Sequence, residues 1–99
     1  MERLSEEQIT KELEQLPKWR RLEDDKWIAR AYHFKDFLTG IRFVDQVAEY
    51  AESKNHHPFI TIDYKKVILK ISSWQAKGLT DLDFEMVRHF DQLYEEARN

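Results

Sequence analysis

The chain has 99 residues, of which 41% are hydrophobic, so we expect a single domain, residues 1–99, with one modest core. It contains no cysteine, which excludes disulfides, thiolate catalysis and cysteine-based zinc sites. The formal net charge is −3 and the basic residues are scattered, which argues against direct nucleic-acid binding through a basic face.

The N-terminal segment MERLSEEQITKEL is charged from its second residue and lacks the apolar core of a signal peptide. No apolar run approaches the ~18 residues that a membrane-spanning helix requires. We therefore expect a cytoplasmic protein that does not enter a membrane.

The first elements are a helix and two short strands. Ser5 and Gln8 form a capping-box pattern, which predicts a helix that runs to about Leu16. Apolar residues then favour strands at Trp19–Leu22 and Trp27–Phe34, on either side of an acidic turn at Glu23–Asp25.

A long helix is predicted from about Asp36 to Ser53, because apolar residues recur at spacings of four and three. This apolar stripe comprises Phe37, Ile41, Val44, Ala48 and Ala51. The segments FITID and KVILKIS then alternate with a period of two, which predicts a hairpin that turns at Tyr64–Lys66.

The segment SWQAKGL is expected to be a loop, and Thr80 to cap a last helix with Asp83 at its third position. The resulting order is α-β-β-α-β-β-α. Two hairpins with helices between them predict an α+β domain, with a four-stranded antiparallel sheet and three helices packed on one face.

The stretch Asn55-His56-His57-Pro58 places two titratable rings at the joint between a helix and a strand. Pro58 disfavours helical backbone at His57 and keeps it extended, so the rings cannot be freely placed, which suits an oriented acid or base. The alternative is a pair of surface histidines in an ordinary loop. A metal site is disfavoured, because adjacent side chains of an extended segment point to opposite faces and no third ligand has a recognised spacing.

Other polar and aromatic residues have ordinary explanations when each is taken alone. Asp83 can simply stabilise a helix start, Trp74 can be a core or interface aromatic, and Glu52 can be a solvated helix charge. The string of Glu52, His56-His57-Pro58, Tyr64, Trp74 and Asp83, at these spacings, resembles the signature of the pterin-4a-carbinolamine dehydratase family. The segments FKDF and GLTDLD also resemble that family, and the similarity runs from about Trp19 to the last helix.

The resemblance implies a lyase that dehydrates a 4a-hydroxytetrahydropterin to quinonoid dihydropterin and so recycles the pterin cofactor of aromatic amino acid hydroxylases. No metal and no cofactor is implied, but the reaction needs an acid and a base, and histidine can be either near neutral pH. The catalytic residues implied are His56, His57 and Asp83, with pterin contacts from Glu52, Ser72, Ser73 and Trp74. Better-known members carry a third histidine at the position of Trp74, and an indole cannot titrate.

The resemblance also implies a homodimer or homotetramer with a small-molecule pterin as its partner. In support, the long predicted helix has more large apolar residues than one buried stripe needs: Phe37, Leu38, Ile41, Phe43 and Val44. Two alternatives remain open. One is a non-catalytic interaction module of the same fold, like the family members that act as transcription coactivators, and the other is a histidine-dependent metal-binding domain.

Overall fold

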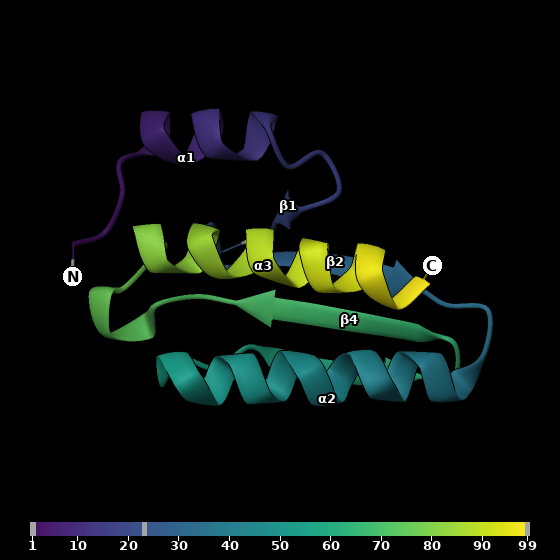
Figure 1. Cartoon of the computed structure of the whole chain (residues 1–99). Helices are drawn as coiled ribbons and strands as arrows, with labels where there is room; N and C mark the ends of the chain where they lie inside the picture. The colour runs from purple at the N-terminus through teal and green to yellow at the C-terminus, as the bar shows by residue number, and fades with distance from the viewer. Residues whose placement is uncertain (1, 23, 99) are drawn as a thin grey trace.

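The computed structural model describes residues 2–22 and 24–98, and within them three α-helices and one four-stranded sheet. Figure 1 shows them: α1 (Glu6–Glu14), β1 (Arg20–Arg21), β2 (Ile28–His33), α2 (Phe37–Lys54), β3 (Phe59–Asp63), β4 (Lys66–Ile71) and α3 (Asp81–Arg98). This confirms the predicted order and the α+β class. The segment predicted as a loop also contains a short 3₁₀ helix, η1 (Trp74–Ala76). Glu23, in the predicted acidic turn, lies outside the described residues.

The sheet joins two hairpins in the strand order β1-β2-β4-β3, and each neighbouring pair is antiparallel. Ile28, where β2 begins, lies opposite Ile71, where β4 ends. Phe59, where β3 begins, lies opposite Lys70, the residue before that end. The joint that follows α2 and the loop that precedes α3 therefore meet at one end of the sheet.

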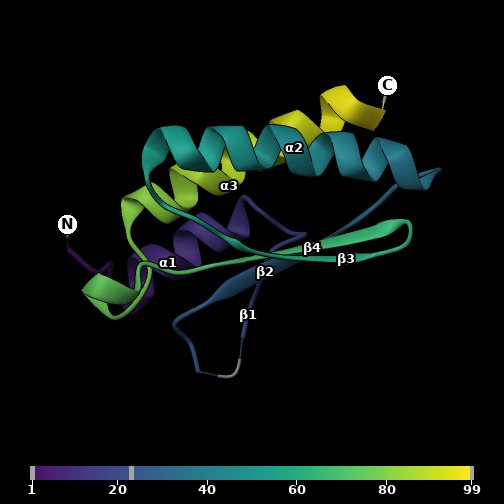
Figure 2. The same cartoon turned by 90° about the horizontal axis from the view of Figure 1, so that it is seen from below.

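The helices cover one face of the sheet. Figure 2 shows α2 and α3 side by side on that face, and α1 adds the buried side chain of Ile9 to the same core. Alternate strand residues point toward the helices, so Tyr32, Val67, Leu69 and Ile71 are fully buried. Within the described part of the chain, no helix covers the opposite face (Figure 2).

The apolar stripe predicted for α2 is not its buried face. The buried residues are Thr39, Gly40, Phe43, Val47 and Ala51, so only Ala51 belongs to both sets. The stripe predicted the helix correctly, but α2 is apolar on two sides, and spacing alone does not say which side meets the sheet. Gly40 favours the observed side, since a Cβ there would lie 3.3 Å from Cδ2 of Phe34. No helix in the described ranges is long and apolar enough to cross a membrane.

A half-buried carboxylate, that of Asp91, joins α3 to β2. Oδ1 of Asp91 accepts hydrogen bonds from the Tyr32 hydroxyl at 2.6 Å, the Arg30 guanidinium at 2.8 Å and the Trp19 indole at 3.0 Å. Burial, reinforced by Asp91, raises the pKa of Tyr32 far above its usual range. The phenol therefore stays neutral and remains a donor to Asp91.

Candidate active site

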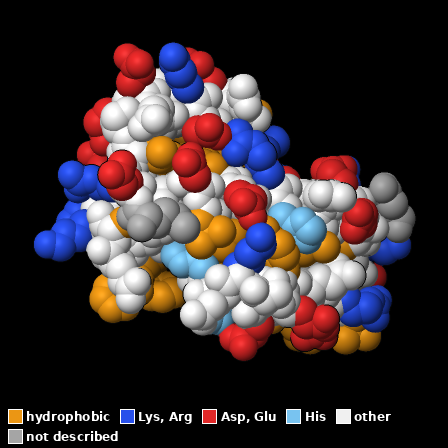
Figure 3. Space-filling model, turned by 60° about the vertical axis from the view of Figure 1, so that its left-hand side comes forward, with side chains coloured by type: hydrophobic (Ala, Val, Ile, Leu, Met, Phe, Trp, Pro, Cys, Tyr) orange, Lys and Arg blue, Asp and Glu red, His pale blue; other side chains and the backbone are white. Residues whose placement is uncertain are grey.

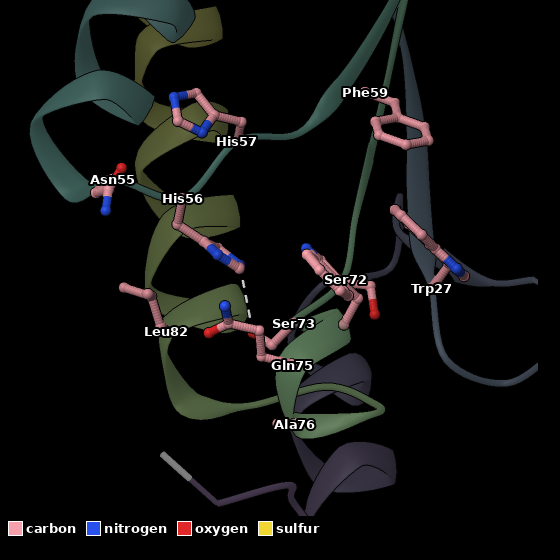
Figure 4. Close-up of a pocket in the computed structure, with 11 residues that line it drawn as sticks. Trp27, Asn55, His56, His57, Phe59, Ser72, Ser73, Gln75, Ala76 and Leu82 are labelled. Atoms are coloured by element: carbon pink, nitrogen blue, oxygen red, sulfur yellow. Dashed lines mark hydrogen bonds between the residues drawn. The ribbon is translucent and has the colours of Figure 1, made fainter.

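A cavity of about 690 Å³ opens at the end of the sheet where β2 and β3 begin. Its lining comes from the α2–β3 joint, the β4–α3 loop and the residue before β2: Trp27, Asn55, His56, His57, Phe59, Ser72, Ser73, Trp74, Gln75, Ala76 and Leu82. Figure 4 shows the two histidines on one side of the opening, with Trp27 and Phe59 on the other. The volume is in the range of small-molecule sites.

Acidic, basic and hydrophobic side chains are interspersed on the face toward this end of the molecule, and histidine side chains reach its surface (Figure 3). Neither acidic nor basic side chains dominate that face (Figure 3).

The α2–β3 joint fixes the two histidine rings. Asn55 ends α2 in the left-handed region, at φ 51° and ψ 42°, which asparagine tolerates better than most residues. The backbone N–H groups of Asn55 and His56 bond back to carbonyls of the last turn of α2, at 3.1 and 3.2 Å, and together form a Schellman motif. Pro58 is buried and follows at once. The backbone on both sides of the His56–His57 pair is therefore restrained.

His56 is bonded to a fully buried carboxylate. Its Nε2 lies 2.8 Å from Oδ1 of Asp83. Asp83 is the third residue of α3, where the free N–H groups and the helix dipole stabilise a negative charge. Its other oxygen accepts from the Ser73 hydroxyl at 2.7 Å and from the Thr80 N–H at 2.8 Å. The carboxylate is therefore held in place by donors on every side.

This bond determines which nitrogen of His56 can act in the cavity. The groups around Asp83 are donors, and an ionised carboxylate only accepts, so Nε2 of His56 carries a hydrogen. In the neutral ring the lone pair is then on Nδ1. The His56 side chain is 18% exposed and lines the cavity, so a small molecule can reach it. Such a ring can take a proton at Nδ1 while Asp83 holds its other N–H.

His57 forms a second, more exposed pair. Its Nε2 lies 2.6 Å from Oε1 of Glu52, and both side chains are largely exposed. Of the residues that the structure describes, the cavity lining includes His57 but neither Glu52 nor Asp83. The structure thus places the two carboxylates behind the two rings, and their roles toward a substrate remain predictions.

The β4–α3 loop supplies the other predicted contact residues. Ser72 and Ser73 are buried, and the backbone N–H of Ser73 donates to the carbonyl of Gly78 at 3.1 Å, which closes the loop. Trp74 begins η1 and is 74% exposed at the rim of the cavity. All three lie where they can meet a ligand in the cavity.

The sequence interpretation missed two aromatic residues of the lining, Trp27 and Phe59. Each stands at the start of a predicted strand, but the strands β2 and β3 are not neighbours in the sheet. The predicted strands located both residues, but only the strand order shows that they meet.

In residues 2–22 and 24–98, no group of three or more histidine, cysteine, aspartate or glutamate side chains is arranged to hold a metal ion. The pairs His56–Asp83 and His57–Glu52 use the Nε2 atom of each ring for a carboxylate. Each ring is therefore oriented by a carboxylate at Nε2, which leaves Nδ1 as the atom that can act toward a ligand.

Residues 2–93 match the family model described as pterin 4 alpha carbinolamine dehydratase. The chain belongs to the pterin-4-alpha-carbinolamine dehydratase family. A protein of Picosynechococcus sp. named for this family is 41% identical over 91 residues, which cover 92% of this chain and 97% of that protein. A Sulfurisphaera tokodaii protein named likewise is 37% identical over 93 residues, 94% of this chain and 98% of its own.

Solved structures agree with the family. A crystal structure from Brucella melitensis, described as a transcriptional coactivator/pterin dehydratase, has a TM-score of 0.88 and 33% identity, and covers 93% of this chain and 98% of that one. A pterin dehydratase-like RuBisCO assembly factor of the alpha-carboxysome has a TM-score of 0.68 at 17% identity, covering 78% of this chain and 92% of that one. The second likeness concerns the fold alone.

Proposed function

We propose that this member of the pterin-4-alpha-carbinolamine dehydratase family dehydrates a 4a-hydroxytetrahydropterin to quinonoid dihydropterin. In doing so it recycles the pterin cofactor of aromatic amino acid hydroxylases. The observation that carries the proposal is the bond from Nε2 of His56 to the buried carboxylate of Asp83, at the wall of a cavity of small-molecule size.

The reaction breaks the bond from carbon 4a to its hydroxyl group and removes the proton on nitrogen N5. The N5 lone pair expels the hydroxide and forms the C4a=N5 double bond, so no electrons leave the molecule. A proton donor must convert the departing hydroxide to water, and a base must take the N5 proton. One acid and one base near neutral pH suffice for this step, and exchange with water then returns a proton to the acid and removes one from the base. Positioned help of this kind is worth ~10²–10⁴-fold in rate.

In this proposal His56 is the base. Its Nδ1 takes the N5 proton, and the resulting imidazolium keeps its bond to Asp83 through Nε2. Asp83 is a positioning residue, because it acts through the ring. His57 is the acid: its Nε2–H is held by Glu52, and its protonated form donates from Nδ1 to the departing hydroxyl.

The remaining predicted contacts hold the pterin. The backbone of Ser72 and Ser73 faces the polar edge of the heterocycle, and Trp74 stacks on the ring or donates its indole N–H to the hydroxyl. Because indole does not titrate, proton transfer depends on the histidine pair.

The test is the decay of the 4a-hydroxy intermediate, followed by stopped-flow absorbance with and without the protein. We expect faster decay with wild type and with His33→Ala, since His33 is exposed on β2, away from the cavity. We expect His56→Ala to lose most of the acceleration. Decay that micromolar wild-type protein leaves unchanged would reject the proposal.

A second candidate is a protein-interaction role, with or without catalysis. It is favoured by two side chains on α2, Phe37 and Leu38, which are 44% and 59% exposed. The Brucella melitensis relative is described as both coactivator and dehydratase, so the two roles are compatible in one fold. An interaction module without dehydratase activity would leave the intermediate's decay unchanged.

A further inference from the structure

One wall of the cavity has no part in these proton transfers. The rings of Trp27 and Phe59 line it, with centroids 5.0 Å apart and planes inclined at 41°. Nζ of Lys70 lies 4.7 Å from the centroid of the Trp27 ring and 5.5 Å from that of the Phe59 ring. These three residues form the aromatic–lysine wall, whose two rings lie across the opening from the histidines in Figure 4.

The register of the sheet assembles this wall. Lys70 lies between Phe59 on β3 and Ala29 on β2, and directly paired residues share a face of the sheet. Trp27 precedes Ala29 by two residues and so points to the same face. This is the face that no helix covers among the described residues (Figure 2). Three strands therefore fix the wall in place beside the cavity.

The core does not need the aromatic–lysine wall. Phe59 is 61% exposed, whereas the core is built on the other face of the sheet. Among the described residues no carboxylate forms an ion pair with Lys70, although Lys54 and Lys66 each have one. An exposed and a half-buried aromatic ring beside a cavity, with a cation on their faces, are typical of a binding surface.

The chemistry of the wall matches one end of a pterin and not the other. The pyrimidine edge presents the donors N3–H and the 2-amino group, and aromatic faces with an ammonium group offer them no acceptor. Lys70 could donate to the 4-oxo group of that edge, but both neighbouring donors would then be left unpaired against the wall. The substituent on carbon 6 is attached next to N5, the atom on which His56 acts. A flat apolar group there can stack on Trp27 and Phe59, and an anion at its end can pair with Lys70. The cavity of about 690 Å³ has the size of sites for drug-sized ligands, more than a two-ring heterocycle fills.

We propose that the aromatic–lysine wall binds the carbon-6 substituent of the substrate and favours substituents that combine an aryl group with a carboxylate. This inference rests on the proposed function for the identity of the ring, and it adds the class of pterin. It makes Lys70 and Phe59 determinants of specificity.

The test uses unreactive 7,8-dihydropterins, whose binding is measured by calorimetry without turnover. One probe carries a 6-methyl group, and the other carries p-aminobenzoylglutamate (dihydrofolate). We expect wild type to bind the second probe about three- to tenfold more tightly, with a preference that weakens as salt is added. Lys70→Gln should remove most of that preference, and Phe59→Leu part of it.

Lys66→Gln is the matched control, because Lys66 lies on the same strand and the same face, four residues from Lys70. It should keep the preference. Equal affinity of wild type for the two probes, or equal losses in the two lysine variants, would overturn the inference. So would a change in molecular mass by light scattering in Lys70→Gln with the preference kept, because the wall would then be a contact between copies.

The binding experiment separates the two proposals. A preference that depends on Lys70, without acceleration of dehydration, would reject the proposed reaction but support binding of the substituent by the aromatic–lysine wall. Faster decay of the 4a-hydroxy intermediate of a 6-methylpterin, with no preference between the two probes, would support the proposed reaction. It would reject only the proposal that the aromatic–lysine wall binds the carbon-6 substituent.

Discussion

Nε2 of His56 lies 2.8 Å from Oδ1 of Asp83, although 27 residues separate them in the sequence. The contact joins the end of α2 to the first turn of α3. The other oxygen of the same carboxylate accepts the backbone N–H of Thr80, the residue just before that helix. One side chain thus orients a ring of the site and stabilises a helix start.

The first prediction is that Asp83→Asn inverts the tautomer of His56. The amide oxygen of asparagine is its single acceptor, and the Thr80 N–H and the Ser73 hydroxyl both require that acceptor. The amide NH₂ then faces Nε2 of His56 and places the ring proton on Nδ1. We expect kcat to fall by about two to four orders of magnitude, because the proposed base loses its lone pair. Imidazole ¹⁵N shifts report the tautomer directly.

Asp81→Asn is the control for this substitution, since Asp81 is an exposed carboxylate in the same first turn of α3. It should change neither the tautomer nor kcat. An Asp83→Asn protein that is folded, inactive and still protonated on Nε2 would show that Asp83 does not act through the tautomer.

The second prediction concerns the two histidines. His56→Ala should lower kcat by about two to four orders of magnitude and change KM much less, because the ring acts mainly in the transition state. His57→Ala should also lower kcat, but less, because water can reach this exposed position and replace its proton. Matched kcat and KM measurements on both variants test this order, and a larger loss in His57→Ala would exchange their assigned roles.

Local signals predicted much of the fold. The capping box of Ser5 and Gln8 and the alternation in β3 and β4 are set by neighbouring residues, and the structure has both. The buried face of α2 could not be predicted, because apolar residues lie on two sides of it. The contact between Trp27 and Phe59 depends on strand order, which no local pattern contains.

The candidate site, too, was predictable from the sequence only in part. The two histidine rings follow from one tetrapeptide, in which Pro58 keeps His57 extended. That Asp83 belongs to the site followed from family resemblance and not from spacing. The distance between Asp83 and His56 depends on how α2 and α3 pack, so only the structure provides it.

The third prediction concerns stability. Tyr32→Phe removes one of three donors to Asp91 and should lower the free energy of unfolding by about 1–3 kcal/mol, because Tyr32 is fully buried and its acceptor is charged. Tyr64→Phe, at an exposed phenol in the β3–β4 turn, should change it by less than about 0.5 kcal/mol. Urea unfolding measures this free energy for both variants. Equal changes in Tyr32→Phe and Tyr64→Phe would show that the Tyr32–Asp91 bond contributes little to stability.

The fourth prediction is a homodimer or homotetramer. Phe37 and Leu38 are large apolar side chains exposed on α2, and β3 is an open edge of the sheet. Light scattering should give the mass of two or four chains, and Leu38→Glu should lower it without unfolding the chain. Glu96→Lys, a charge reversal at an exposed site of α3, is the control and should leave the mass unchanged. A monomer mass for wild type at working concentration would contradict the prediction.

The last prediction assigns Trp74 to binding. The indole stands at the rim, 74% exposed, and can donate a hydrogen bond but does not titrate near neutral pH. Trp74→Ala should therefore raise KM about three- to tenfold through lost stacking, with a small change in kcat. Trp74→His should be tolerated, and a rise in kcat would show that a titratable ring helps at this position.

Trp74→Phe separates the two roles open to the indole. It keeps an aromatic face and removes the N–H, so KM near the wild-type value with unchanged kcat indicates stacking alone. A fall in kcat in Trp74→Phe, matched by Trp74→Ala, would instead mean that the N–H donates to the departing hydroxyl in the transition state. If Trp74→His abolished activity while His56→Ala kept it, the proton transfer would have to be reassigned to His57 or to bound water.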